Sequence, residues 1–513
     1  MGANYSAAAF RRSIVQYTAG RLLNALAAFL IFVWIARQLP EPQYANYIAA
    51  FALLEIGLVL SGFGMEWVTA VFVPQAKLKA TGKILGKFVW QCLMVQACTL
   101  LIGACLLFML APTLNDWFRL ENATGALRIY AVVMFVEGVG RVFRDQLLSC
   151  LLLQAAAQVS QMTRNIAMLV FAFWVFQNEG WRTAEGLAIA ELSASGGSLI
   201  VAAIFLYRHL VACRDDPAGE PDWCLPRWRE MLRAGRNAWI SNLANLSWGG
   251  QMVILLVTRI IGTEATAPLG FSRNLAEQVR KFMPMDFLLG IIRTLLIARF
   301  SEEGDLQKMG TRIGLAFKAN LLFLLPLLVV VIVRGEEICG LLSGGRYETA
   351  HWPLVGWLTV LLVWAHHRLT DLLAHALGRS GLTSRASILL SVTPLLLFLV
   401  AEAQHWALLF VVLVIAEVAY SYMVLVRLKT AQWRYRLHWI SLAKFGLAAL
   451  LAAGAVAATK VAAGGGVMAM LIATGLAFAV MWTGVWVFRA WTHEEEMLLP
   501  ERIRRSPLKR REK

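Results

Sequence analysis

Four charged side chains lie near the middle of a stretch, residues 128–153, that is otherwise apolar enough to cross a membrane: Glu137, Arg141, Arg144 and Asp145. At about 100° per residue, an α-helix brings all four onto one face. A central Arg in a membrane helix costs about 2.5 to 3.5 kcal/mol, and this stretch has two. We therefore expect the charged face to look into protein or a water-filled cavity.

Two interpretations of this face stay open. Glu137 with Arg141, and Arg141 with Asp145, have the i,i+4 spacing of ion pairs, which would neutralise one another inside a helix bundle. Arg144 would then be left over, and buried ion pairs are weak devices for stability. We favour an anion-binding cavity in which Arg141 and Arg144 contact the ligand, while Glu137 and Asp145 tune the charge or couple to ions.

A second charged stretch, residues 268–298, repeats the same spacing of i, i+4, i+7 and i+8 with Arg273, Glu277, Arg280 and Lys281. We expect its basic residues to bind the same anion and Glu277 to tune their charge. The alternative is that the membrane segment begins only at Phe282 and the charged turn lies outside it. The remaining stretch would still contain Asp286 and Arg293.

A third charged stretch, residues 351–377, carries His366, His367, Arg368, Asp371 and His375. His367, Asp371 and His375 share one helix face at a spacing that could hold a metal, but no further ligand pair stands out, and we expect no metal. A structural His–Asp pair and a His that couples transport to protons are the two alternatives. Arg368 is expected to join the anion site.

Together, the three stretches are expected to place cations at the inner, central and outer levels of one cavity. Guanidinium groups pair with phosphate oxygens in a forked geometry, so this arrangement suits a diphosphate. Outside these stretches, Glu55 and Glu66 are intramembrane carboxylates that are candidates for protonation or cation binding.

The composition of the chain predicts the kind of elements that position these residues. The chain has 513 residues, of which 59% are hydrophobic, and a mean hydropathy of +0.62. These values predict an all-α polytopic membrane protein. Apolar runs of about 20 residues predict fourteen transmembrane helices, at residues 13–36, 44–73, 88–110, 128–153, 166–176, 183–207, 239–258, 268–298, 313–333, 351–377, 387–401, 406–426, 440–459 and 467–488.

Most of the 48 Lys and Arg residues fall in connections that lie on one side of the membrane in this arrangement. The positive-inside rule then places both termini in the cytoplasm. The net charge of +16 needs no nucleic-acid partner, because it is mainly this topology signal. The seven cysteines are scattered and predict neither a disulfide framework nor a metal site.

The longest polar connection divides the predicted spans into two halves in matching order. Because an even number of spans separates them, the halves would be parallel repeats. The expected organisation is an N-terminal six-helix half (1–207), a cytoplasmic linker (208–236), a C-terminal six-helix half (237–428), an accessory helix pair (429–488) and a basic cytoplasmic tail (489–513).

Three segments resemble the Wzx-type polysaccharide flippases of the multidrug/oligosaccharidyl-lipid/polysaccharide exporter (MOP) superfamily. ARQLP at 36–40, followed by Tyr44, looks like a turn of that family. Residues 269–302, from LGF to RFSE, are similar to its eighth span and the following turn. LSGGRYETA at 342–350 looks like its glycine-tyrosine turn before the tenth span.

The resemblance implies an alternating-access flippase whose two halves rock against each other. It would move an undecaprenyl-diphosphate-linked oligosaccharide across the bacterial inner membrane for cell-surface polysaccharide biosynthesis, such as O-antigen or exopolysaccharide. Arg141, Arg144, Arg280 and Arg368 would contact the headgroup. No cofactor is expected beyond a coupling ion, H⁺ or Na⁺, and a polysaccharide polymerase and chain-length proteins are candidate partners beside the lipid-linked glycan and the bilayer.

Other functions remain as alternatives. Fourteen spans and a basic cavity bring the chain close to lipid II flippases, which move the peptidoglycan precursor. A membrane glycosyltransferase or an O-antigen ligase is the enzymatic alternative, although the predicted external connections are short. The acidic cavities of the drug exporters in the superfamily fit less well, because the first span lacks a carboxylate. No nucleotide-binding loop or catalytic triad is present, so we expect a transporter and not an enzyme.

Overall fold

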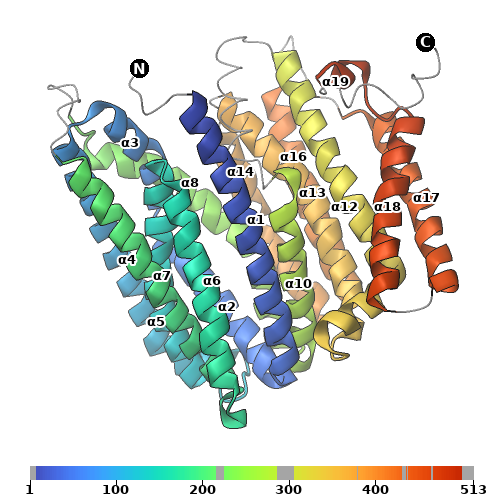
Figure 1. Ribbon diagram of the computed structural model, residues 1–513, viewed down its shortest axis with the longest axis horizontal. Coiled ribbons are helices and arrows are strands. Elements are labelled where there is room, and N and C mark those ends of the chain that lie inside the picture. The colour runs from blue at the N-terminus through green and yellow to red at the C-terminus, as the bar shows by residue number, and fades with distance from the viewer. Residues whose placement is uncertain are drawn as a thin grey trace. The chain divides into compact units, whose positions relative to one another are not determined.

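The computed structural model describes residues 7–214, 224–285, 306–377, 379, 381–429, 435, 437–463 and 466–498, and every regular element in these ranges is a helix (Figure 1). The predicted all-α class is therefore confirmed. The chain forms two compact units. The first holds Met1–Gly270 with Pro394–Gln404, and the second holds Phe271–Thr393 with His405–Lys513.

The first unit contains the helices that carry the first charged group. They are α1 (Ala7–Gln38), α2 (Glu41–Ser61), α3 (Met65–Lys79), α4 (Gly82–Trp117), α5 (Thr124–Arg141), the π-helical turn η2 (Val142–Leu148), α6 (Gln154–Phe176), η3 (Glu179–Trp181), α7 (Ala184–Ala212), α8 (Trp228–Ser247), α9 (Gly250–Ile260), the start of α10 (Thr263–Phe282) and most of α15 (Thr393–Glu402).

The second unit contains the rest of α10 and the helices after it. They are α12 (Leu306–Ser343), η4 (Glu348–Ala350), α13 (His351–Ala376), α14 (Gly381–Leu389), η5 (Leu390–Val392), α16 (Trp406–Leu428), α17 (Trp439–Ala463), α18 (Val467–Val487) and the short α19 (His493–Leu498). Here α13 packs between α12 and α16, while α17 and α18 pack on each other and on α12.

Local sequence explains several helix boundaries. Pro40 follows the end of α1, and Glu41 and Pro42 occupy the first turn of α2, where a missing N–H costs nothing. Thr183 caps α7 because its hydroxyl accepts a hydrogen bond from the Gly186 N–H at 3.1 Å. In the predicted glycine-tyrosine turn after α12, Gly345 has a φ of +86°, a conformation that favours glycine.

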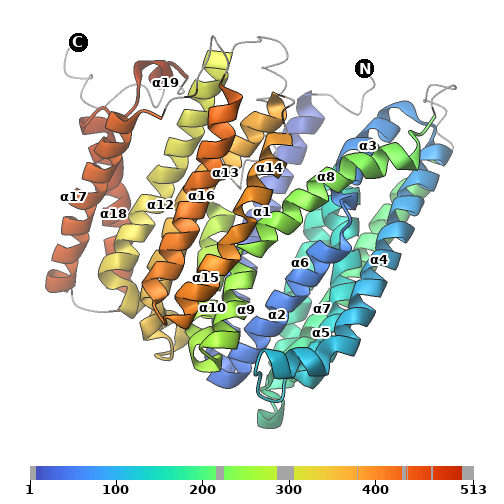
Figure 2. The same cartoon turned by 180° about the vertical axis from the view of Figure 1, so that it is seen from behind.

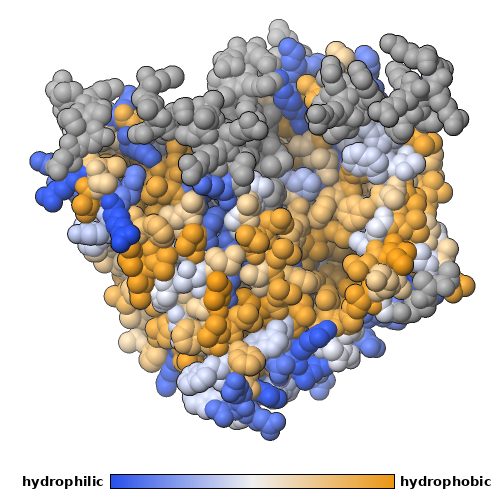
Figure 3. Space-filling model, viewed as in Figure 1, coloured by the Kyte–Doolittle hydropathy of each residue, from blue (hydrophilic) through white to orange (hydrophobic). Residues whose placement is uncertain are grey.

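Within the described residues, eleven helices are long and apolar enough to span a membrane. They correspond to eleven of the fourteen predicted spans, so the count of fourteen is not confirmed. The other three are the charged stretches, of which two form α5 with η2 and α13, while the third is described only as far as Met285 and includes α10. Figure 3 shows the apolar side chains that cover much of the outward surface on one face.

Three predicted spans are broken, and the one at 387–401 is divided among α14, η5 and α15. The span predicted at 44–73 ends as α2 at Ser61 and resumes as α3, because Gly64 turns the chain with a φ of +74°. A Cβ at Gly64 would lie 2.1 Å from the Gly235 carbonyl oxygen, so the two glycines allow α3 and α8 to approach closely (Figure 2). The span predicted at 239–258 breaks between α8 and α9 at Trp248 and Gly249.

The predicted span at 166–176 was too short. Its helix, α6, begins at Gln154 and has 23 residues. The preceding span ends earlier than predicted, because the chain leaves the helix at Leu151 and Leu152, and Leu152 has a φ of +62°. This boundary places Arg164 inside a membrane-length helix.

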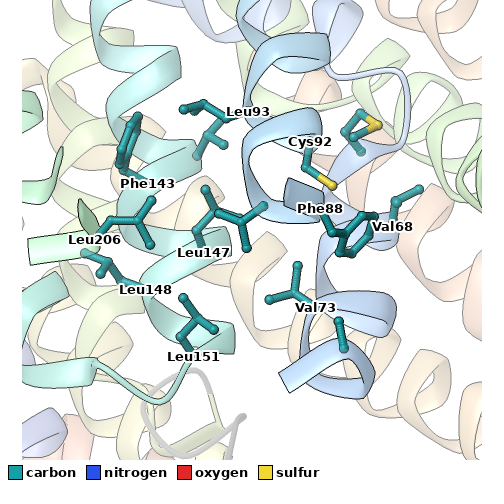
Figure 4. Close-up of a cluster of buried hydrophobic side chains, with 14 of the residues drawn as sticks. Val68, Val73, Phe88, Cys92, Leu93, Phe143, Leu147, Leu148, Leu151 and Leu206 are labelled. Carbon is teal, nitrogen blue, oxygen red and sulfur yellow. The ribbon is translucent and has the colours of Figure 1, made fainter. Parts of the chain in front are cut away.

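An apolar core supports the end of the first charged helix (Figure 4). Leu147 and Leu148 of η2 are fully buried, and Phe88 and Cys92 of α4 lie in the same cluster with Val73 of α3. Burying a Leu or Phe side chain contributes about 1.5 to 3 kcal/mol. This packing fixes the position of η2 and of the charged residues on it.

Candidate functional site

Glu137 of α5 is the centre of the charged group in the first unit. Its Oε1 accepts hydrogen bonds from Arg141 Nε at 3.2 Å and Arg144 Nη2 at 2.8 Å. Its Oε2 accepts one from Arg164 Nε at 3.0 Å. Glu137 is 3% exposed, so one buried carboxylate holds three guanidinium groups.

Two further carboxylates complete the pairing. Arg141 makes a forked pair with Glu55 of α2, with N–O distances of 2.6 and 3.1 Å. Arg164 of α6 also donates to Glu191 of α7 at 2.7 Å, and Glu191 accepts the Tyr130 hydroxyl at 2.9 Å. The network therefore joins α2, α5, η2, α6 and α7, with three Glu and three Arg side chains in balance.

Arg144 is the most enclosed of these cations, with 2% of its surface exposed. Besides Glu137 it donates to Ser198 Oγ of α7 at 2.8 Å, and Ser198 is bonded to Ser160 of α6. The premise that Arg144 is left over after ion pairing is therefore wrong. Arg141 differs, because a third of its side chain is exposed and can reach a ligand.

Asp145 lies within electrostatic range of Arg141 and Arg144 but is not hydrogen-bonded to them in the part of the chain that the structure describes. The α-helix ends at Arg141 and continues as the π-helical turn η2, which holds more residues per turn and rotates the following side chains. Asp145 is exposed and makes no ion pair with Arg141 among the described residues. The structure joins Glu137, Arg141 and Arg144 by hydrogen bonds as expected, while Asp145 forms no hydrogen bond or ion pair with them among the described residues.

Sequence reasoning did not propose Arg164 and Glu191 as site residues. The signal for Glu191 was a single acid in the middle of the apolar stretch 183–207. Arg164 was overlooked because the predicted span began two residues after it. Glu55 was recognised as an intramembrane carboxylate, but its partner was not.

In the second unit, α10 carries the second predicted group. Glu277 pairs with Arg273 at 3.7 Å and with Arg280 at 3.0 Å, so these three side chains lie together as predicted. Lys281 donates to Gln278 at 3.0 Å. Asp286 and Arg293, and the RFSE segment of the resemblance, lie outside the described residues.

Two cations converge on one aromatic ring. The guanidinium carbon of Arg280 lies 5.2 Å from the ring centroid of Trp364 on α13, and that of Arg368 lies 5.5 Å from it. Both distances are in the range of cation–π attraction. Among the described residues Arg368 makes no ion pair, and its side chain is partly exposed. Of the four predicted ligand-binding residues of this unit, Arg280 and Arg368 therefore lie beside the same ring, that of Trp364, while Arg273 and Lys281, which the structure also describes, do not contact it in this way.

Next to Arg368, His367 is buried between two carboxylates. Its Nδ1 lies 2.5 Å from Glu417 Oε2 on α16, and its Nε2 lies 3.4 Å from Asp371 Oδ2. Tyr420 of α16 donates its hydroxyl to Asp371 Oδ1 at 2.6 Å, and its ring stacks on His367 at 3.6 Å. Glu417 was not predicted, although it is the central acid of an apolar span.

The described residues contain no group of three or more His, Cys, Asp or Glu side chains placed to hold a metal ion. Each unit also contains partly exposed guanidinium groups, that of Arg141 in the first unit and those of Arg280 and Arg368 in the second. Such groups bind phosphate in a forked geometry.

Residues 10–297 match the sequence profile of a family described as "Polysaccharide biosynthesis protein", over more than half of the chain. The chain belongs to this family. Among curated proteins the sequence has no match. The family assignment agrees with the resemblance that three short segments had suggested.

Solved structures show the same fold as this polysaccharide biosynthesis protein. A structure described as "Lipid II flippase MurJ, inward closed conformation" has a TM-score of 0.67 at 13% identity, over 92% of this chain and 98% of that one. An inward-facing multidrug resistance MATE family transporter of the MOP superfamily has a TM-score of 0.58 at 15% identity, over 80% and 98%. An outward-facing one has 0.52 at 13%, over 81% and 94%.

At these identities the likeness concerns the fold alone. Together with its apolar helices, it makes the chain a multi-pass membrane protein with the fold of MOP superfamily flippases and transporters.

Proposed function

We propose that the chain is an alternating-access flippase for an undecaprenyl-diphosphate-linked oligosaccharide in the bacterial inner membrane, where it serves cell-surface polysaccharide biosynthesis. The family match supports the pathway, and the shared fold supports a transporter and not an enzyme. A polysaccharide polymerase and chain-length proteins would act on the translocated glycan.

The observation that carries the proposal is the pair of guanidinium groups beside Trp364. Arg368 makes no ion pair with a described residue, so its charge is available to a ligand. The Arg280 side chain is 39% exposed and pairs with Glu277 at 3.0 Å. A diphosphate carries several negative oxygens and would pair with both, while the indole ring would contact a sugar or the lipid stem.

The first unit contributes differently. In the first unit Arg141 is partly exposed and held in place by Glu55 and Glu137, and in this proposal it also binds phosphate. Arg144 and Arg164 are enclosed by their carboxylates and would keep Arg141 in position.

The test is binding of undecaprenyl diphosphate to the purified protein in detergent, measured by native mass spectrometry or by quenching of tryptophan fluorescence. We expect Arg368→Gln to weaken binding by about 10- to 100-fold, because a hydrogen bond to a charged group is worth about 1.5 to 3 kcal/mol. Arg385→Gln is the matched control, since Arg385 of α14 is exposed. Arg368→Lys should bind with intermediate affinity, because it keeps the charge and loses the fork.

The cellular readout is surface polysaccharide together with lipid-linked intermediates on the inner leaflet. In a bacterium whose own copy is deleted, Arg368→Gln at normal membrane levels should trap the intermediate inside and reduce surface polysaccharide. Normal binding and normal export by the Arg280→Gln, Arg368→Gln double variant would overturn the proposal. If the protein in vesicles transports lipid II as well as or better than the lipid-linked oligosaccharide, its substrate is the peptidoglycan precursor. If the mass of the lipid-linked substrate changes, the protein is a transferase.

A further inference from the structure

We propose that the buried side chains His367, Asp371 and Glu417 form a proton-binding site between α13 and α16, and that its proton strengthens binding of a diphosphate at the adjacent Arg368. This inference rests on the proposed function for its ligand. It adds the identity of the ion and the residues that hold it.

The geometry of the imidazole ring indicates a proton. Each ring nitrogen of His367 faces a carboxylate oxygen, Nδ1 toward Glu417 and Nε2 toward Asp371. A neutral imidazole has only one N–H, so it can donate to only one of the two acids. Both contacts are satisfied when the three side chains hold one more proton, which our proposal assigns to the ring. His367 is 4% exposed, so water cannot replace the missing donor.

The surroundings fix this arrangement. Tyr420 of α16 stacks on the ring and donates to Asp371, so the carboxylate is oriented toward Nε2. From α14, the hydroxyls of Thr383 and Ser387 lie beside Tyr420. These neighbours leave the ring little freedom to turn away from either acid.

Other charged groups near the site lie on α13 itself and on the helices that pack against it. On α13, His366 lies beside His367 in sequence and packs its ring against Phe317 of α12. The following residue of α12, Lys318, is paired with Glu495. On α14, Arg385 is exposed. The helical turn η4 lies at the other end of α13, next to His351.

The net charge of the three side chains shows how proton binding affects diphosphate binding. With the proton, His367, Asp371 and Glu417 sum to one negative charge beside Arg368. Without it the sum is two negative charges, and Asp371, released from the ring, competes for Arg368. A diphosphate is repelled more strongly in the second state, so proton binding and diphosphate binding favour each other.

A sodium ion fits the site less well. Sodium is a hard cation that prefers several oxygen ligands, as calcium does. Here the imidazole ring occupies the space between the two carboxylates, where such an ion would have to lie. The proton is therefore the ion that the three side chains favour.

The first measurement is direct and needs no ligand. We expect nuclear magnetic resonance of ¹⁵N-histidine-labelled protein to show one doubly protonated imidazole at neutral pH, and we expect its signal to vanish in His367→Gln and persist in His405→Gln, whose histidine is exposed. A neutral His367 at neutral pH would overturn the proposal whatever the fate of the proposed function.

The second measurement is undecaprenyl diphosphate binding across pH. In the wild-type protein, affinity should fall as pH rises, and binding in weak buffer should take up protons. Glu417→Gln removes one of the two charges that hold the proton, so the midpoint of this fall should move to lower pH by about 1 to 3 units. Glu402→Gln, at an exposed acid of α15, should leave the midpoint unchanged.

The outcomes separate the two proposals. Absence of undecaprenyl diphosphate binding by the wild-type protein would reject the proposed function, while the resonance experiment would still decide the proton site. Tight binding with the same pH profile in wild type and in both His367→Gln and Glu417→Gln would reject the linkage. If binding depends on sodium concentration at fixed pH and does not depend on pH, the ion at this site is sodium and not a proton.

Discussion

Glu137 is the residue on which the charged group of the first unit depends. It accepts hydrogen bonds from Arg141, Arg144 and Arg164 while almost fully buried. Glu137→Gln keeps the shape but leaves three guanidinium groups with two carboxylates. Removing one partner of a buried ion pair costs about 3 to 5 kcal/mol, so we expect a lower unfolding temperature of the detergent-solubilised protein in a thermal scan.

The matched control for Glu137→Gln is Glu179→Gln, since Glu179 lies exposed in η3. Its unfolding temperature should equal that of the wild type. If Glu137→Gln unfolds at the wild-type temperature too, water reaches the guanidinium groups and the network is not a stabilising one.

Sequence reasoning succeeded at the residue scale where a charge was conspicuous against an apolar background. Glu137, Arg141, Arg368 and His367 were found in this way, and the structure places each in a polar group. Their partners could not be predicted, because pairing depends on which helices pack together. Arg141 with Glu55 joins residues 86 positions apart, and no periodicity within one helix reports such a contact.

At the scale of elements, a buried ion pair attaches the short helix α19 to α12. Glu495 is buried and pairs with Lys318 of α12 at 2.5 Å, while its neighbour Glu494 accepts the Thr311 hydroxyl at 3.0 Å. Thr492 and Glu495 also cap each other, which is the pattern of a capping box. The segment after α18 is therefore attached to α12.

This attachment predicts a double-mutant cycle. Glu495→Gln leaves the Lys318 ammonium buried without its partner, and Lys318→Met does the same to the carboxylate. Each single change should cost about 3 to 5 kcal/mol, and the double change should cost less than their sum. Limited proteolysis should show earlier cleavage after α18 in the single variants.

Glu494→Gln is the control for this cycle, because its contact with Thr311 is exposed and worth at most about 1 kcal/mol. Additive effects of the two single changes would show that Lys318 and Glu495 do not interact energetically.

Elements were predicted well where apolar runs were continuous and poorly where short glycine-containing turns interrupted them. The hairpin of α17 and α18 is close to its predicted bounds. The breaks after α2 and after α8 were missed, because Gly64 and Gly249 look like tolerated helix residues in an apolar run. The π-helical turn was missed for a similar reason, since side-chain types alone do not reveal an added residue in a helical turn.

At the scale of the whole molecule, the charges divide into two populations with different roles. Most of those in α5, η2, α10 and α13 are paired or lie beside Trp364, and these helices, as described, are not among the eleven apolar spans. Most other Lys and Arg residues lie in connections and at the C-terminal end. We propose that the first population serves a ligand, and we expect the second to orient the chain in its membrane.

The orientation itself is a prediction. We expect both termini in the cytoplasm, because the most basic connections and the end of the chain fall on one side when the predicted spans alternate. A green fluorescent protein fused after residue 513 should fluoresce, and alkaline phosphatase fused there should be inactive, since it folds only outside the cytoplasm. The same pair fused before residue 1 should give the same result.

The connection between α17 and α18 provides the internal control, because α17 begins near the basic segment that precedes it and ends one membrane crossing later. Alkaline phosphatase inserted there should be active. Alkaline phosphatase fused to a shortened chain that ends before α17 should be inactive. Active phosphatase after residue 513 would reverse the orientation of the whole molecule. Arg368 and the His367 site would then face the opposite side of the membrane, and a flippase would have to load its diphosphate from outside.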